Sequence, residues 1–157
     1  MQIVYQKPLL DEVDLMQNIL EFEVQKGYVL PRNKESFAKE IRSFWAAFGI
    51  NQDKREMLGF CALQIYSQSL GEIRSLVVAE PYRNQGIASN LVQKVIKEGR
   101  ELGISEFLVL TYHPRLFEFL GFHQIEKTCV PNQKIWADCV SCKHFPNCNE
   151  IALLKKY

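Results

Sequence analysis

The amino-acid sequence predicts an α+β fold, in which a mixed, mostly antiparallel sheet carries helices on both faces and contains a central parallel strand pair. An apolar strand pattern over Glu72–Val78 is followed by the clearest helical pattern of the chain, Gly86–Leu102, and then by a second apolar strand pattern over Phe107–Thr111. A helical crossover joins neighbouring parallel strands with a right-handed turn. We therefore expect these two strands to be the parallel pair. A further strand pattern, Met57–Ser67, precedes the first across a short turn at Gln68–Gly71, as in a hairpin.

The first third of the chain predicts one strand and two helices. Residues Gln2–Gln6 alternate enough for a first strand, and Asp11–Gln25 has apolar side chains at helical spacing. A second helix is predicted over Asn33–Phe48, where Asn33 can cap the first turn. Its apolar stripe, which we interpret as core, consists of Phe37, Ile41, Phe44, Trp45 and Phe48. A short strand is expected at 49–51.

The elements after the parallel pair are shorter. Gly103 follows the long helix as a C-terminal glycine. The run at 107–110 is apolar on both faces, which is typical of a buried central strand. The remaining predictions are a helix with proline near its first turn and two strands, at Pro114–Leu120, His123–Lys127 and Glu150–Lys155.

Length and composition exclude several classes of protein. A chain of 157 residues is expected to form a single domain, 1–157. A net charge of +1 without a basic block does not suggest nucleic-acid binding. No apolar run has the length of a signal-peptide core or a membrane span, so we expect neither export nor membrane insertion. Five cysteines without an export signal favour reduced thiols and a cytoplasmic protein.

The most informative segment joins the Glu72–Val78 strand to the long helix and reads Arg83-Asn84-Gln85-Gly86-Ile87-Ala88. The first backbone N–H groups of a helix lack helical partners, and the helix dipole favours negative charge there. Gly86 allows close approach of a phosphate to the backbone, and Arg83 adds a cation. The six residues alone also fit a surface turn. They match neither the dinucleotide fingerprint nor a P-loop.

In the order of strand, Arg-x-x-Gly-x-Ala turn, helix, strand, short helix and Gly-Phe, the chain resembles the GNAT superfamily of acetyl-CoA-dependent N-acetyltransferases. The resemblance covers about Gln2 to Leu153. It implies that the strand before the turn splays from its parallel neighbour and pairs with the pantetheine arm of acetyl-CoA. It also implies a pyrophosphate site at the turn. The implied cofactor-binding residues are Leu76, Val77, Val78, Arg83, Asn84, Gln85, Gly86, Ile87, Ala88 and Ser89.

The resemblance also implies catalytic groups. The backbone N–H of Val78 would face the developing oxyanion. Glu72 lies where a base is often placed in the superfamily, and it would act through a water molecule. Many members have a tyrosine four residues before the glycine of Gly-Phe, but this chain has Phe117 there. Tyr112 or water could return the proton to the thiolate instead. A solvated strand-end carboxylate is the alternative reading of Glu72.

Within the superfamily, the chain is similar to short, stand-alone N-acetylglutamate synthases. The patches that carry this similarity are 71–78, 82–83, 108–111, 28–32 and 134–148. It implies direct acetyl transfer to the α-amine of L-glutamate, the first step of arginine synthesis. No segment resembles the amino-acid-kinase domain of longer synthases, so arginine feedback through that domain is not expected. The oligomeric state stays open, with a homodimer as one candidate.

A glutamate site needs cationic clamps for two carboxylates, and the planar fork of arginine suits this task. Arg32 is the first choice because it matches the family's carboxylate-binding position. Arg74 shares a strand face with Glu72, so the two can also pair with each other. The other candidates for a second clamp are Arg115, Lys127 and Lys134.

Two alternatives stay open at this stage. The same fold could acetylate another amine, such as a polyamine, an antibiotic or a protein N-terminus. The chain could also be a non-catalytic module that binds acetyl-CoA as a regulator.

Four cysteines have the spacing of a zinc knuckle: Cys129, Cys139, Cys142 and Cys148. Their thiolates could hold a structural zinc. Small buried thiols are the other interpretation, because the second pair lacks Cys-x-x-Cys spacing. Cys61, inside a strand pattern, is expected in the core.

Overall fold

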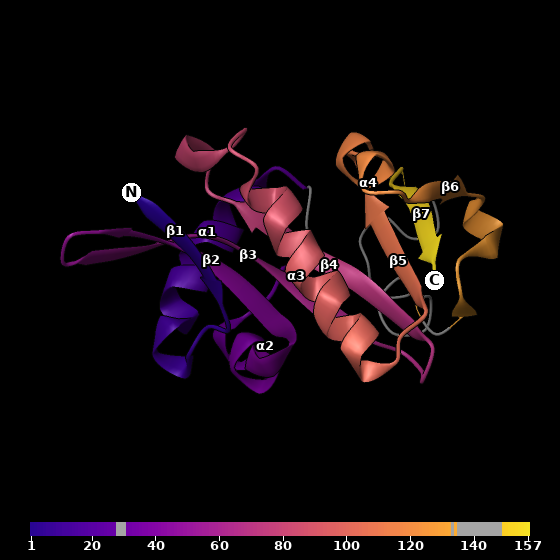
Figure 1. Cartoon of the computed structure of the whole chain (residues 1–157), viewed down its shortest axis with the longest axis horizontal. Helices are drawn as coiled ribbons and strands as arrows, with labels where there is room; N and C mark the ends of the chain where they lie inside the picture. Colours follow the sequence, from indigo (N-terminus) through magenta and orange to yellow (C-terminus); the bar gives the residue numbers. More distant parts are fainter. Residues whose placement is uncertain (28–30, 133, 135–148) are drawn as a thin grey trace.

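A computed structural model of the chain describes residues 1–27, 31–132, 134 and 149–157 (Figure 1). Within these residues, seven strands form one sheet in the order β1-β2-β3-β4-β5-β7-β6. The strands are β1 Gln2–Gln6, β2 Phe44–Asn51, β3 Lys54–Ile65, β4 Leu70–Val78, β5 Glu106–Thr111, β6 His123–Ile125 and β7 Ile151–Lys156. The helices are α1 Val13–Gln25, α2 Lys34–Lys39, α3 Ile87–Leu102 and α4 Arg115–Phe119. The described residues also form four short 3₁₀ turns: η1 Leu10–Glu12, η2 Ile41–Ser43, η3 Glu80–Tyr82 and η4 Lys127–Cys129.

The predicted α+β class and the parallel pair are confirmed. Strands β4 and β5 run parallel, and the other neighbouring pairs are antiparallel. The pairing of β4 with β5 covers only Leu70–Glu72 against Glu106–Leu108, although β4 continues to Val78. A bulge in the β3–β4 ladder follows, and Ser75 there has φ of 53°. Bulges bend a strand, so β4 turns away from β5 and leaves a wedge between them.

Helices cover both faces of the sheet, as expected. One apolar cluster joins α1 and α2 to β2, β3 and β4 through Met16, Leu20 and Phe37. The other cluster joins α3 and α4 to the opposite face through Leu91 and Phe117. Figure 1 views the sheet from the α3 side. The right-handed crossover helix therefore packs on the face toward the viewer and begins near the end of β4.

The prediction of a helix over Asn33–Phe48 is wrong. Asn33 does cap a helix, because its side chain accepts from the Ser36 N–H at 2.8 Å, but that helix ends at Lys39. Residues Phe44–Asn51 form strand β2 instead. In β2, even-numbered side chains such as Phe44 and Phe48 enter one apolar cluster, and Ala47 enters the other. A spacing of four residues fits both the helical and the strand period, so the aromatic stripe could not separate them.

The other predicted elements are confirmed, with shifted ends. The strand predicted at Met57–Ser67 begins earlier, at Lys54, and the one predicted at His123–Lys127 ends at Ile125 before η4. The long helix begins after Gly86 and ends before Gly103, and both glycines have positive φ. Among the described residues, no helix is both long and apolar enough to cross a membrane.

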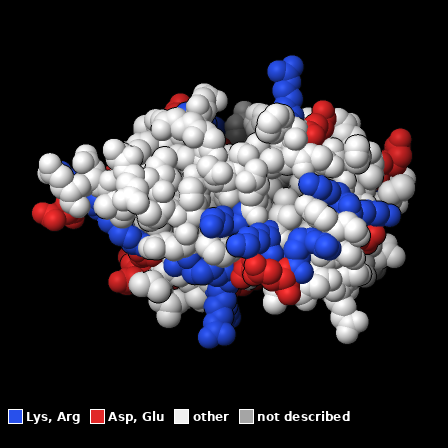
Figure 2. All heavy atoms as spheres, viewed as in Figure 1, with Lys and Arg blue, Asp and Glu red and all other residues white. Residues whose placement is uncertain are grey.

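Basic side chains gather on the face that α3 covers, with acidic side chains beside them (Figure 2). In one such cluster, the Lys7 ammonium lies 3.1 Å from Oε1 of Glu98. The other carboxylate oxygen of Glu98, Oε2, accepts a hydrogen bond from the Trp45 indole N–H at 2.8 Å. The ammonium of Lys94 lies over the same indole ring. These contacts join α3 to the start of the sheet.

Candidate active site

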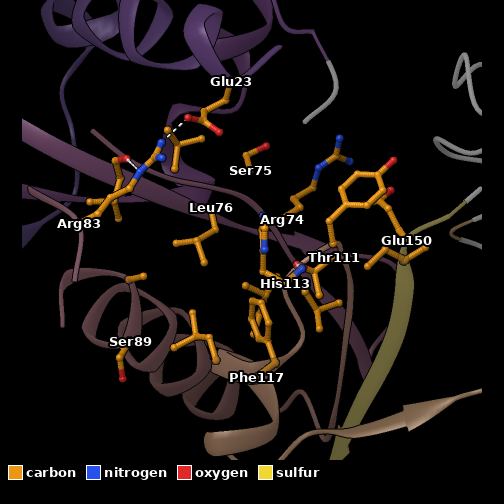
Figure 3. Close-up of a pocket in the computed structure, with 18 of the residues that line it drawn as sticks. Glu23, Arg74, Ser75, Leu76, Arg83, Ser89, Thr111, His113, Phe117 and Glu150 are labelled. Atoms are coloured by element: carbon orange, nitrogen blue, oxygen red, sulfur yellow. Dashed lines mark hydrogen bonds and ion pairs between the residues drawn. The ribbon is translucent and has the colours of Figure 1, made fainter. Parts of the chain in front are cut away.

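The wedge between β4 and β5 opens into a cavity of about 860 Å³. This volume suits a small-molecule or cofactor site. Its walls come from the second half of β4, the turn before α3, the end of β5 and the start of α4. Residues Glu23, Val24, Gly27 and Pro31, in α1 and the segment after it, close another side. The cavity therefore lies where the sequence placed its phosphate turn and splayed strand (Figure 3).

The start of α3 presents backbone N–H groups to this cavity. Gly86 is the N-cap, with φ of 79° and no side-chain cap. The helical ladder begins with the bond from the Asn90 N–H to the Gly86 oxygen, so earlier N–H groups cannot bond within the helix. Gly86, Ile87, Ala88 and Ser89 all line the cavity. A Cβ at Gly86 would meet no heavy atom within 4 Å, which leaves open space for an anion.

The turn before the helix holds the other predicted phosphate residues. Asn84 lines the cavity and has φ of 62°, whereas Gln85 is not among the lining residues. The Tyr82 hydroxyl donates to Glu56 on β3 at 2.7 Å, and this carboxylate raises the pKa of Tyr82. The phenol therefore stays protonated at neutral pH and ties η3 to the β2–β3 hairpin.

Arg83 has partners of its own. Its Nε donates to the backbone oxygen of Val78 at 3.0 Å, and its guanidinium forms an ion pair with Glu23 on α1. Figure 3 shows Glu23 beside Arg83. The cation predicted for this turn is therefore present, but its charge is compensated by a carboxylate.

The bond from Arg83 shows which way Val78 faces. The Ala79 N–H donates to the Leu58 oxygen on β3, so Ala79 faces β3 and its neighbour Val78 faces the other side. The contact of the Val78 oxygen with Arg83 agrees with this alternation. The N–H and the carbonyl of one strand residue point to the same side, so the Val78 N–H faces the wedge.

Glu72 lies in the cavity wall at the closed end of the wedge. Its side chain is only 3% exposed, and the Lys134 ammonium lies 2.9 Å from both of its carboxylate oxygens. The Tyr66 hydroxyl donates to the same carboxylate at 2.6 Å. The alternative reading of Glu72 as a solvated strand-end carboxylate is wrong, because the group is buried and paired. Lys134, a candidate clamp, is the buried partner of Glu72.

The two arginines predicted to bind substrate lie in different places. Arg74 lines the cavity together with Glu72. Arg32 is not among the lining residues; its guanidinium forms an ion pair with Glu40 and lies against the Phe37 and Phe44 rings. The structure thus brings Arg74, and not Arg32, to the other predicted site residues.

The remaining candidates divide in the same way. Phe117 and Tyr112 line the cavity, and Phe117 packs edge-on against Phe122. Arg115 and Lys127 are exposed and are not among the lining residues. Leu76, Val77 and Val78 all line it.

The zinc prediction falls largely outside the described residues, since Cys139, Cys142 and Cys148 are not described. Cys129 is described and exposed. The described part of the chain contains no group of three or more side chains that could hold a metal ion. Cys61 is buried as predicted, and burial raises the pKa of its thiol above the usual range.

Sequence reasoning missed Glu23 and the partners of Glu72. The signal for Glu23 was present, because it follows Met16 and Leu20 at helical spacing on the buried face of α1. A carboxylate at a core-facing position needs a cation. The contact of Tyr66 and Lys134 with Glu72 has no local signal, since Lys134 is 62 residues away along the chain.

Taken together, the cavity offers an anion-binding helix start, a strand edge with an inward N–H group and a buried carboxylate. The helix start can bind a phosphate. An inward N–H can stabilise an oxyanion, and a carboxylate can take a proton from an amine. This is the equipment that acyl transfer to an amine requires.

Known proteins with similar sequences support this chemistry. The acetyltransferase (GNAT) family model matches residues 13–122. An uncharacterized N-acetyltransferase of Chlorobaculum tepidum is 38% identical over 146 residues, which cover 93% of this chain and 91% of that protein. An amino-acid acetyltransferase of Mycobacterium tuberculosis is 28% identical over 107 residues, and the chain covers 58% of its length.

Solved structures agree on the fold. A Mycobacterium tuberculosis protein crystallised with CoA and a second ligand has a TM-score of 0.84 at 22% identity, with 98% of this chain and 99% of that chain covered. N-acetylglutamate synthase from Neisseria gonorrhoeae, complexed with coenzyme A and N-acetyl-glutamate, has a TM-score of 0.82 at 19% identity. That likeness covers 99% of this chain and 35% of the synthase chain. The family match over most of the chain and the relative at 38% identity show that this protein is an N-acetyltransferase of the acetyltransferase (GNAT) family.

Proposed function

We propose that this enzyme transfers the acetyl group of acetyl-CoA to the α-amine of an amino acid, and that the amino acid is L-glutamate. The observation that carries the proposal is the wedge between β4 and β5, which ends at the open start of α3. In this proposal, the product N-acetylglutamate enters arginine synthesis.

The described residues fit acetyl-CoA. The N–H groups of Gly86, Ile87, Ala88 and Ser89 would hold the pyrophosphate, with the positive end of the α3 dipole behind them. The edge of β4 that faces the wedge would pair with the pantetheine arm. Because backbone groups alternate along a strand, Leu76 and Val78 face the wedge, and Val77 faces β3.

The chain's own groups then have three tasks. The Val78 N–H donates to the thioester oxygen, which gains negative charge as the amine attacks. Glu72 accepts the proton that the attacking amine loses, through a water molecule. Phe117 occupies the position of the usual tyrosine and has no acidic hydroxyl group, so Tyr112 or water returns a proton to the leaving thiolate. A thioester is already reactive, so positioning supplies much of the acceleration.

Glutamate is favoured as the acceptor by charge and by relatives. Arg74 lines the same cavity as Glu72, and an arginine fork binds a carboxylate with two hydrogen bonds. Three described carboxylates line the cavity, Glu23, Glu72 and Glu150. Glu23 and Glu72 are each paired with a cation, so the cavity has little net negative charge to attract a polyamine. Amino-acid acetyltransferases are among the similar proteins, and one similar structure holds N-acetyl-glutamate.

The test is release of CoA from acetyl-CoA in the presence of single amines: L-glutamate, L-glutamine, spermidine and a peptide. We expect L-glutamate to give the highest kcat/KM and mass spectrometry to detect N-acetylglutamate. A higher kcat/KM for spermidine or for the peptide would refute the acceptor. If acetyl-CoA binds but no CoA is released with any of the amines, the protein is a non-catalytic module.

A further inference from the structure

One ion pair at the edge of the cavity has no task in the proposed function. The Glu23 carboxylate on α1 is paired with the Arg83 guanidinium, and Arg83 Nε donates to the Val78 oxygen at 3.0 Å. Figure 3 shows Glu23 and Arg83 meeting beside the cavity. We call the three groups the Glu23–Arg83–Val78 clasp. It joins α1, the phosphate turn and the end of β4.

Glu23 and Arg83 each need the opposite charge of the other. The Glu23 side chain is 11% exposed, whereas that of Arg83 is 36% exposed. A buried carboxylate is stable only when it is paired and hydrogen-bonded, so Glu23 needs this guanidinium. The guanidinium in turn lies near the start of α3, where the positive end of the dipole disfavours a cation. The carboxylate of Glu23 compensates for that charge.

The compensation changes the role of Arg83. A cation already paired with a carboxylate attracts a phosphate less than a free one does. The backbone N–H groups of α3 remain the main anion donors. Arg83 then acts mainly as a strut, whose Nε holds the backbone of Val78 at the mouth of the wedge.

The position of Val78 matters more than that of most residues. An oxyanion donor must lie about 3 Å from the charge that develops, and misplacement by about 1 Å can cost on the order of 100-fold in rate. Beyond Glu72, β4 has lost its pairing with β5, so the end of β4 needs support from elsewhere. In addition to the hydrogen bonds with β3, the Arg83 side chain supports the end of β4, and the ion pair with Glu23 holds Arg83 in place.

We propose that Glu23 is a positioning residue for acetyl transfer: it fixes Arg83, and through Arg83 it holds the Val78 N–H in place. The inference rests on the proposed function, in which this N–H faces the oxyanion. Because Val24, Gly27 and Pro31 of the same region also line the cavity, the clasp couples one cavity wall to the phosphate turn.

Kinetics of Glu23→Gln provide the first test, with Glu21→Gln, an exposed carboxylate on the same helix, as the matched control. We expect Glu23→Gln to lower kcat about 10-fold and to change KM for acetyl-CoA less than about threefold, because the α3 N–H groups remain. The Glu21→Gln variant should match the wild type. A kcat within twofold of the wild type for Glu23→Gln would overturn the proposal.

The double variant tests whether Glu23 acts through Arg83. If it does, Glu23→Gln combined with Arg83→Gln should be no slower than Arg83→Gln alone, and multiplied losses would contradict the relay. The kcat of Arg83→Lys should stay as low as that of Arg83→Gln, since an ammonium lacks the planar fork that contacts both Glu23 and the Val78 oxygen. A wild-type kcat in Arg83→Lys would contradict the positioning role, because it would show that only the positive charge of Arg83 matters.

Hydrogen exchange of the Ala79 amide tests the clasp without any acceptor, because this N–H belongs to the same peptide unit as the Val78 carbonyl and donates to the Leu58 oxygen. In the free enzyme, we expect this exchange to accelerate at least threefold in Glu23→Gln and in Arg83→Gln, and not in Glu21→Gln. Unchanged exchange would refute the clasp even in an active enzyme. An enzyme that acetylates no amine would refute the proposed function, and the exchange result would still decide on the clasp.

Discussion

At the scale of single residues, the cavity keeps buried charges in pairs. Glu23 is joined to Arg83, and Glu72 is joined to Lys134. Breaking a buried pair leaves an uncompensated charge, which typically costs about 3–5 kcal/mol, whereas a neutral isostere costs less. Variants of these two pairs should therefore be neutral and of similar shape, and their folding should be checked by thermal denaturation.

Substitution of Arg74 by alanine tests the carboxylate clamp. We expect KM for L-glutamate to rise roughly 10- to 100-fold, because a charge-assisted hydrogen bond contributes about 1.5–3 kcal/mol. KM for acetyl-CoA should change by less than about twofold. Arg115→Ala, an exposed arginine on α4, is the matched control and should behave as the wild type.

The variant Arg32→Ala separates the two arginines. Its guanidinium pairs with Glu40 and lies against Phe37 and Phe44, so we expect a lower melting temperature with KM for glutamate nearly unchanged. A large rise in KM in Arg32→Ala together with a normal KM in Arg74→Ala would return the clamp to Arg32.

The base is tested by Glu72→Gln, which keeps the shape of the side chain and removes its charge. We expect kcat to fall at least 100-fold, since general base catalysis typically contributes 10²–10⁴. Glu80 carries an exposed carboxylate in η3, just after β4, and Glu80→Gln is the control. If Glu72→Gln retains a third or more of the wild-type kcat, the proton leaves by another route.

At the scale of elements, helix α3 follows the proposed phosphate turn. Its two ends are similar in backbone but not in surroundings. Gly86 and Gly103 flank the helix with φ of 79° and 105°. A Cβ at either position would meet no heavy atom within 4 Å. Only Gly86 lines the cavity. The two glycines therefore form a matched pair for separating stability from binding.

The variants Gly86→Ala and Gly103→Ala should lose similar stability, about 1–2 kcal/mol each, because both force a non-glycine residue into the left-handed region. Only Gly86→Ala should raise KM for acetyl-CoA, by about 10-fold or more, since its methyl group occupies the space proposed for phosphate. Calorimetry and steady-state kinetics measure the two effects. Equal KM values in both variants would place the pyrophosphate elsewhere.

Elements with local signals could be predicted from the sequence, and those that depend on distant partners could not. The long helix was recognisable from its period and its two glycines, and the turn before it from its place after a strand. Strand β2 was mistaken for a helix because both of its faces are buried, so Phe44 and Phe48 carry no alternation with polar residues. The choice between Arg32 and Arg74 depended on Glu40 and on the aromatic rings, which only the folded chain brings to Arg32.

At the scale of the whole molecule, the sheet is continuous except where β4 leaves β5. Helices α1 and α2 close one face, and α3 and α4 close the other. The cavity takes its walls from both sides: Glu23 from α1, Ile87 from α3 and Phe117 from α4. The wedge is thus the place where the two layers meet, and substrate binding there can order both. We expect CoA to raise the melting temperature of the enzyme as its concentration passes Kd.

A crystal structure of the enzyme with CoA tests the central claim most directly. The account predicts the pyrophosphate within hydrogen-bond distance of the backbone N–H groups at 86–89, and the pantetheine arm between the end of β4 and β5. CoA bound away from the wedge, or a wedge closed by pairing of Leu76 and Val78 with β5, would contradict it.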